Sequence, residues 1–193
     1  PYFRESMRAE LTAMFKQKDD KGRFVYHKED GSPYNIYNDG LKIYTTINPE
    51  MQAYAEAALE RHLREELQPA FDKNNQGLKN YPFSNNMKEE QVNEIMKRAR
   101  KQSERYRVMR ETGLSEEEIL KSFGQAVPMK VFSWKGDIDT IMTPNDSIRY
   151  YKAFLHAGLI SIEPQTGFIK AWVGGANFNH FAYDHVRQGK RQV

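Results

Sequence analysis

The sequence predicts an α+β fold in which amphipathic helices are interspersed with short antiparallel hairpins. Helices are indicated where apolar residues recur at steps of three and four, and residues 87–112 form the longest such stretch. A hairpin is indicated at residues 159–173, where two short runs flank a turn that contains Pro164 and Gly167. Because two strands alone are only marginally stable in water, we expect this hairpin to belong to a larger sheet and the chain to be an incomplete piece of a domain.

Composition excludes several classes of protein. The 193 residues can form one full-sized domain or two small ones, and a net charge of +3 nominates no polyanionic partner. The absence of cysteine excludes disulfides, thiolate catalysis and cysteine-type zinc sites. No apolar run approaches the roughly 18 residues of a membrane span, so this piece is expected to be soluble. The chain begins at Pro1, which predicts a piece of a longer protein.

The first part of the chain is predicted to alternate helices and strands. The predicted elements are a helix over residues 1–18, a short strand over 23–27, a longer strand over 41–47 and a helix over 49–68. The longer strand is predicted because its residues are mostly β-branched or aromatic. Asn48 can cap the helix that follows, and Pro69 is expected to end it.

The second part is predicted to be mostly helical until the final hairpin. The predicted elements are a loop over residues 69–86, a helix over 87–112, a helix after Ser115, a hairpin of 131–134 and 138–142, a helix from Pro144 and the hairpin of 159–173. Ser115 and Glu118 form a capping box, which Leu114 and Ile119 extend as a hydrophobic staple. Gly113 is expected to end the preceding helix in a left-handed conformation.

The inner faces of two helices follow from the same spacing. The predicted inner residues of the first helix are Phe3, Met7, Leu11, Met14 and Phe15. Those of the helix over 87–112 are Val92, Ile95, Met96, Ala99, Tyr106 and Met109. We expect these side chains to supply much of the core.

Three stretches of the chain resemble a known family. Residues 162–175, IEPQTGFIKAWVGG, with Phe178-Asn179 and Arg191-Gln192-Val193, resemble the segment that leads into the active-site helix of penicillin-binding proteins, especially the bifunctional class A enzymes. Residues 40–49, GLKIYTTINP, resemble the start of its transpeptidase domain, and residues 1–11 resemble the segment after its glycosyltransferase domain. In the family the next residues are Gly-Ser-x-x-Lys, whose serine is the acylated nucleophile, so the chain is predicted to stop just before that motif.

The resemblance implies a domain organisation. The implied parts are an interdomain linker region at 1–39, the N-terminal part of the transpeptidase domain at 40–68 and 157–193, and a mostly helical insertion with a small hairpin at 69–156. Many class A relatives carry a β-rich, OB-like domain at the place of the insertion, and no resemblance is found across these residues.

The resemblance also implies a function. The chain would be a non-catalytic fragment of a bacterial peptidoglycan synthase that spaces domains and scaffolds the transpeptidase site. Its parent would polymerise lipid II, cross-link stem peptides through an acyl-serine that penicillin also forms, and help to set cell shape. The implied partners are lipid II and peptidoglycan strands through the parent, and cell-wall synthesis proteins at the insertion. The implied location is the extracytoplasmic side of the inner membrane, anchored by a segment absent from this chain.

No catalytic residue, cofactor or metal site is predicted in this chain. Every serine lacks a lysine three residues later, the spacing that lets the family's base reach the nucleophile on one helix face. The serines are Ser6, Ser32, Ser84, Ser103, Ser115, Ser122, Ser133, Ser147 and Ser161. Residues 84–86 spell the family's Ser-x-Asn motif and residues 165–167 nearly spell Lys-Thr-Gly, but both precede the expected nucleophile and are interpreted as coincidences.

Two acidic or histidine-containing clusters have an alternative interpretation. His180, Asp184 and His185 could bind a metal, but the two histidines lack the spacing of a zinc-binding helix, so an ordered loop is favoured. Glu29 and Asp30 could be a carboxylate pair for glycosidic chemistry, but their position beside a glycine favours a turn. Neither cluster is therefore predicted to be a site.

The stretch at residues 97–110 supplies the alternative function. Its seven basic residues stand against the single acidic Glu104, which is compatible with a stand-alone interaction or nucleic-acid-binding module. A solvated helix face is favoured, and no nucleic acid is expected, because exposed Lys and Arg commonly fill helix surfaces. Trp134 and Trp172 are expected to pack within hairpins rather than bind a sugar.

Overall fold

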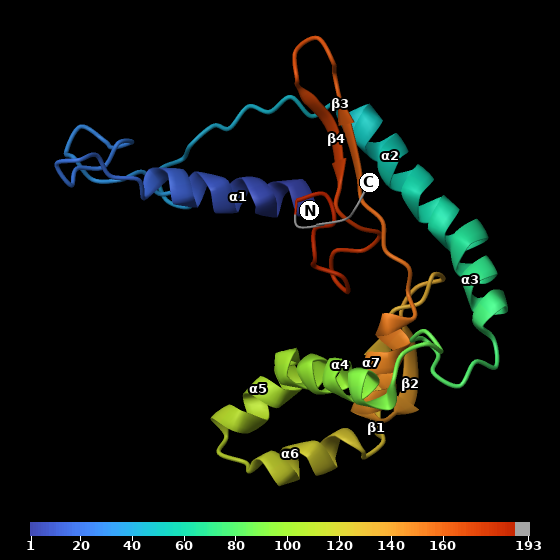
Figure 1. Cartoon of the computed structure of the whole chain (residues 1–193). Helices are drawn as coiled ribbons and strands as arrows, with labels where there is room; N and C mark the ends of the chain where they lie inside the picture. The colour runs from blue at the N-terminus through green and yellow to red at the C-terminus, as the bar shows by residue number, and fades with distance from the viewer. Residues whose placement is uncertain (188–193) are drawn as a thin grey trace. The chain divides into compact units, whose positions relative to one another are not determined.

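The computed structural model describes residues 1–187, and residues 188–193 lie outside the described part. The fold is α+β, as predicted, and the chain divides into two compact units. The first unit comprises Pro1–Arg61 with His156–Val193, and the second comprises His62–Leu155. Figure 1 labels the elements of both.

The core of the first unit lies between one helix and one hairpin. Helix α1 (Tyr2–Phe15) packs on the hairpin of β3 (Leu159–Ile162) and β4 (Ile169–Val173) (Figure 1). The strands are antiparallel, as predicted, and Gly167 reverses the chain with a φ of 72°. The predicted inner face of α1 is only half-buried, and Tyr2 and Ser6 are its buried residues instead.

Residues 41–47 are not a strand, which corrects the prediction. They belong to no strand of the described chain, and Tyr44 is 89% exposed. The hairpin contacts the end of this segment and the start of the next helix. Thr46 Oγ1 donates to the Ile169 carbonyl oxygen over 2.8 Å, and Asn48 N donates to the Lys170 carbonyl oxygen over 2.9 Å. Residues with a high β-propensity form a strand only where a neighbouring strand supplies a continuous series of backbone hydrogen bonds. The two hydrogen bonds found here do not form such a series.

Two other strand expectations are also corrected. Residues 23–27 form only isolated bridges, Lys18 with Phe24 and His27 with Pro33. The hairpin of β3 and β4 does not extend into a larger sheet within residues 1–187, where each sheet has two strands. Side chains cover part of the β4 edge instead, because the Gln52 amide donates to Trp172 O over 2.9 Å and accepts from Trp172 N over 2.7 Å. Gln52 thus replaces a strand residue at that edge.

The helix that begins at Pro49 passes through Pro69 instead of ending there. Helix α2 (Pro49–His62) continues as the π-helical segment η1 (Leu63–Leu67) and then as α3 (Gln68–Asn75). In the π turn, Gln68 N donates to the Leu63 carbonyl oxygen. This wider turn relieves the crowding that a proline ring causes against the preceding turn, so the helical path persists. The predicted loop over 69–86 is therefore helical as far as Asn75.

The second unit contains the remaining elements. They are α4 (Glu89–Gln102), α5 (Glu104–Glu111), α6 (Glu116–Phe123), β1 (Val127–Val131), β2 (Ile138–Met142) and α7 (Pro144–Lys152) (Figure 1). Its buried apolar residues are Leu63, Val92, Met96, Ile119, Phe123, Val131 and Phe132. Strand β1 shares only Val131 with the strand predicted over 131–134, so that prediction is corrected, whereas β2 has the predicted bounds.

The predicted helix over 87–112 is two helices. Ser103 has an extended backbone, with φ −74° and ψ 147°, and its Oγ caps α5 by accepting from Tyr106 N. Serine competes for backbone hydrogen bonds in this way, which is why it favours helix ends. The capping box of Ser115 and Glu118 is confirmed, and so is the left-handed Gly113, with a φ of 86°.

The compact units do not test the predicted domain organisation. They group residues by contact and do not separate a linker from a transpeptidase segment, so the parts at 1–39, 40–68, 69–156 and 157–193 stay a prediction. Among residues 1–187, no helix is long and apolar enough to cross a bilayer.

Candidate functional site

The candidate site is the place where the loop after β4 attaches to helix α1. The loop begins at Gly174 and Gly175, and the Tyr2 ring lies directly on both. A Cβ at Gly174 would lie 2.7 Å from Tyr2 Cγ, and one at Gly175 would lie 2.5 Å from Tyr2 Oη. Tyr2 Oη donates to the Phe181 carbonyl oxygen over 2.6 Å, and the ring contacts Phe178 edge-on. The two glycines are therefore required for close packing of backbone and ring.

Asp184 holds the returning part of the loop. Its side chain is 8% exposed, and its Oδ2 accepts from Trp172 Nε1 over 2.9 Å. Its Oδ1 accepts from the backbone N–H groups of Val186 and Arg187 over 3.0 and 3.2 Å. Burial, together with the nearby Asp184 charge, raises the pKa of Tyr2 to about 12. The Tyr2 hydroxyl therefore remains protonated at neutral pH, as its hydrogen bond to the loop requires.

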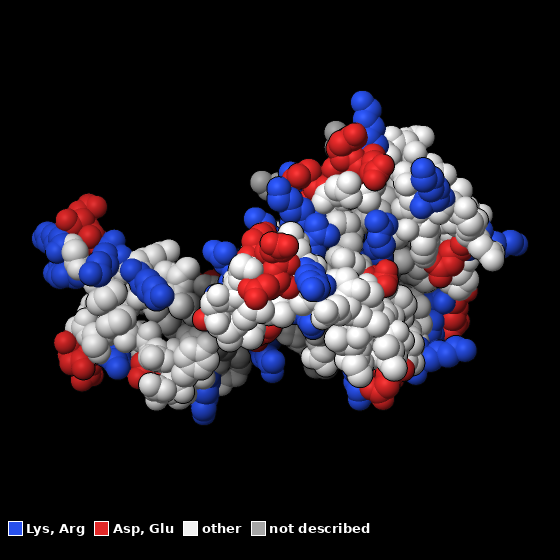
Figure 2. Space-filling view, turned by 90° about the horizontal axis from the view of Figure 1, so that it is seen from below, with Lys and Arg blue, Asp and Glu red and all other residues white. Residues whose placement is uncertain are grey.

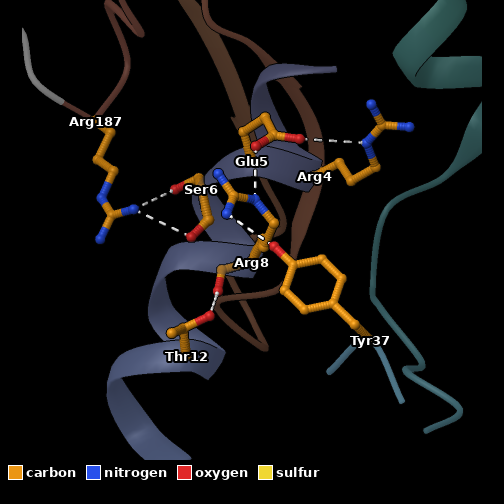
Figure 3. Close-up of polar contacts among 7 residues, drawn as sticks. All are labelled: Arg4, Glu5, Ser6, Arg8, Thr12, Tyr37 and Arg187. Carbon is orange, nitrogen blue, oxygen red and sulfur yellow. Dashed lines mark hydrogen bonds and ion pairs between the residues drawn. The ribbon is translucent and has the colours of Figure 1, made fainter. Parts of the chain in front are cut away.

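Arg187 makes the third attachment. Its Nη1 donates to the carbonyl oxygen and to Oγ of Ser6, both over 3.1 Å, and its Nη2 lies 3.3 Å from Glu10 Oε1. Figure 3 shows Arg187 reaching from the loop to Ser6 on the helix. Tyr2, Ser6, Glu10, Asp184 and Arg187 are called the loop anchor below. Helix α1 contributes three of these residues and the loop two.

A second set of contacts holds helix α1 to the segment that follows it. Arg8 Nε pairs with Glu5 Oε2 over 2.7 Å, and Arg8 Nη1 donates to Tyr37 Oη over 3.0 Å (Figure 3). These contacts raise the pKa of Arg8, chiefly through the hydrogen bond from its guanidinium to Glu5. Helix α1 is thus attached to the loop through Ser6 and to residues 34–39 through Arg8.

The histidine cluster does not come together as a metal centre in the described residues. Asp184 already accepts three N–H donors, and the His185 ring stacks on His156 with centroids 5.1 Å apart. Within residues 1–187, no three histidine or carboxylate side chains are grouped to hold a metal ion. Asp30 serves a turn, because its Oδ1 accepts from Ser32 N and Ser32 Oγ, and these bonds lower the pKa of Asp30.

The basic stretch at 97–110 is partly neutralised by carboxylates. Arg107 contacts Glu104 over 2.7 Å and Glu111 over 3.2 Å. Further pairs join Lys97 to Glu94 and Lys101 to Glu116. Figure 2 shows basic and acidic side chains interspersed over the face that it draws. This arrangement is typical of a solvated helix surface rather than of a phosphate-binding stripe.

Sequence reasoning missed the loop anchor as a set. Ser6 and Arg187 are 181 positions apart, and Tyr2 and Phe181 are 179 apart. One feature of the sequence does indicate part of the anchor. Gly174 and Gly175 follow a strand, and consecutive glycines indicate that another group approaches the backbone closely. Their partner on α1 could not be read from sequence spacing.

Comparison with known proteins gives one match. Residues 78–155 match the family model of the penicillin-binding protein middle domain. This match supports a penicillin-binding protein. No curated protein and no solved structure matches the chain.

The matched range corrects one expectation. It lies inside the second unit and inside the predicted insertion at 69–156, where the sequence was expected to show no resemblance. Helices without short motifs carry few residues that identify a family, whereas the flanking stretches contain the motifs that resemble penicillin-binding proteins. The last residues of the C-terminal stretch that resembles the family, Arg191-Gln192-Val193, lie outside the described residues.

Proposed function

We propose that this chain is a fragment of a class A penicillin-binding protein, a bifunctional peptidoglycan synthase with glycosyltransferase and D,D-transpeptidase activities. The observation that carries the proposal is the middle-domain match over residues 78–155. The flanking stretches support it, because residues 40–49 and 162–175 resemble the transpeptidase domain and fold into one compact unit. The middle domain is then an insertion between two transpeptidase segments.

The fragment's own role in this proposal is to position the loop that leads to the nucleophile. A serine nucleophile must be held within about 0.5 Å of its productive geometry by rigid neighbours. The loop anchor ties residues 174–187 to helix α1 through Tyr2 and Arg187. Helix α1 lies in the predicted linker region, so the same contacts would also set the spacing of the two catalytic domains.

The partners and the location follow from the parent protein. Lipid II and peptidoglycan strands would be handled by the parent's catalytic domains, and other cell-wall synthesis proteins would bind the middle domain. The penicillin-binding family is extracytoplasmic at the cell envelope, and we place this chain on the outer side of the inner membrane, with its anchor elsewhere in the parent.

Labelling with fluorescent penicillin tests the proposal. The chain of residues 1–193 should give no covalent label, because none of its serines has the required lysine three residues later. The full-length parent should be labelled, and its variant with alanine in place of the serine of Ser-x-x-Lys is the matched control. Labelling of residues 1–193 would contradict the fragment proposal, and an unlabelled parent would contradict the family function.

A further inference from the structure

The second unit contains a cavity that the proposed function does not use. Its volume is about 230 Å³, and all of its lining residues belong to His62–Leu155. The lining residues are Gln68, Asp72, Tyr81, Ser133, Trp134, Tyr150, Ala153 and Phe154. Four of the eight are aromatic, and one is charged.

Aromatic residues supply half of the lining. The rings of Trp134 and Phe154 lie 6.1 Å apart, and those of Tyr150 and Phe154 lie 5.1 Å apart, both edge to face. Contacts of this kind fix the rings in place. Because an aromatic face carries negative electrostatic potential, rings whose faces border the cavity would attract a cation.

The charged residue is a carboxylate held in position by two donors. Asp72 Oδ1 accepts from Gln68 Nε2 and from Tyr81 Oη, both over 2.9 Å. Gln68 is 5% exposed and is fixed in turn by Ala153 O and Leu155 N. Both donors use Oδ1, and within residues 1–187 no hydrogen bond or ion pair engages Oδ2. The cavity therefore presents an oriented carboxylate oxygen beside aromatic rings.

We propose that this cavity binds the ammonium group of a small organic cation. The rings would surround the alkylated nitrogen while Asp72 supplies the counter-charge, so both features of the wall are used. A neutral ligand would leave the carboxylate unused, and an anion would be repelled by it. The volume lies below the roughly 300 Å³ at which drug-sized pockets begin, which limits the ligand to one compact head group. A free quaternary amine and a lysine side chain of a peptide share this chemistry.

Binding of two probes to the full chain tests the proposal. Choline represents the free amine, Nα-acetyl-lysinamide represents the peptide side chain, and 3,3-dimethylbutan-1-ol is the neutral isostere of choline. We expect at least one cationic probe to bind, and the isostere to bind about tenfold more weakly than choline if choline is the better ligand. Binding of one probe only identifies the source of the ammonium group. Failure of both cationic probes to bind, or equal binding of choline and its isostere, would overturn the proposal.

Variants distinguish the cavity from other carboxylates. Asp72→Asn retains an oxygen that can accept from Gln68 and Tyr81 but removes the charge, so affinity should fall about tenfold with little change in thermal midpoint. Asp139→Asn makes the same charge change at a residue that is 86% exposed on β2 and should leave affinity unchanged. If Asp72→Asn lowers the midpoint, Trp134→Phe is the second variant, and it should weaken the cation more than the isostere. Equal affinity in the wild type and both cavity variants would contradict this site.

Discussion

At the scale of single residues, the loop anchor depends on the absence of two side chains. Tyr2 can donate to Phe181 O only because Gly174 and Gly175 leave room for its ring. Asp184 then occupies the space on the other side of Gly174, where a Cβ would lie 2.6 Å from its Oδ1. The anchor is therefore sensitive to added volume at these two glycines.

Replacing Gly175 by alanine should destabilise the first unit. The new Cβ would lie 2.5 Å from Tyr2 Oη, so the ring must shift and its hydrogen bond to Phe181 O is weakened. We expect the free energy of unfolding to fall by about 1–3 kcal/mol, measured by urea denaturation. Gly124→Ala is the control, because its Cβ would lie 3.5 Å from Lys121 O and should be tolerated. Equal midpoints for the two variants would contradict this account of the anchor.

The ionisation of Tyr2 should be detectable at alkaline pH. Burial and the Asp184 charge raise its pKa from 10.0 to about 12, and burial together with Asp72 raises the pKa of Tyr81 to about 12 as well. A raised pKa means that the folded state holds the proton more tightly. The resulting stabilisation is complete below pH 10 and is lost as the pH rises through about 12.

Near-ultraviolet absorbance measures this directly. Titration of the chain should show a late tyrosinate phase, and Tyr2→Phe should reduce its amplitude. Tyr44→Phe is the control for removing one tyrosine at an exposed position, since Tyr44 is 89% exposed. A late phase of unchanged amplitude in Tyr2→Phe would show that Tyr2 is not the group responsible.

At the scale of elements, short capping signals were predicted more accurately than long periodic stretches. The capping box of Ser115 and Glu118 occurs as predicted, with Ser115 Oγ accepting from Glu118 N over 3.3 Å. The helix over 87–112 has the predicted buried Val92 and Met96, yet Ser103 divides it. A repeat of three and four residues continues across such a break, so the spacing alone does not reveal the interruption.

Removing the cap should destabilise α6 measurably. Ser115→Ala leaves the N–H of Glu118 without its acceptor and should lower the free energy of unfolding by about 1 kcal/mol. Ser115→Thr keeps a hydroxyl that can accept that bond and donate to Glu118 Oε2, as Ser115 Oγ does over 2.7 Å, so it should retain most of the stability and is the matched control. Glu118 adds a dependence on acid pH, because its hydrogen bonds from Ser115 lower its pKa. That contribution is present above the ordinary glutamate pKa and is lost as the pH falls through the lowered value. Thermal midpoints of the three proteins at neutral pH would decide the matter, and equal midpoints for the alanine and threonine variants would contradict a role for the cap.

At the scale of the whole molecule, charge and topology argue against the nucleic-acid alternative. The basic stretch at 97–110 is interrupted at Ser103, and Arg107 pairs with carboxylates on its own helix. A phosphate-binding surface needs cations that are free to replace counterions along a continuous path. The net charge of +3 over 193 residues adds no strong field of its own.

The sequence by itself determined the features that depend on neighbouring residues. The cap at Ser115 and the hairpin turn at Gly167 are local, because each is formed by groups a few positions apart, and the α+β class follows from such local patterns. The resemblance to penicillin-binding proteins came from short stretches of the same kind.

Only the tertiary structure decided the features that depend on distant partners. Residues 41–47 have the composition of a strand, but their contact with β4 is limited to a bond at Thr46, next to that of Asn48, so no ladder forms and most of the segment is exposed. Pro69 should end a helix, yet a π turn before it allows the helix to continue. The loop anchor joins Ser6 to Arg187, and the residues next to each of them in the sequence do not predict this contact. A hydrogen bond between distant residues depends on the distance and angle between donor and acceptor, and folding must first bring the two chain segments together.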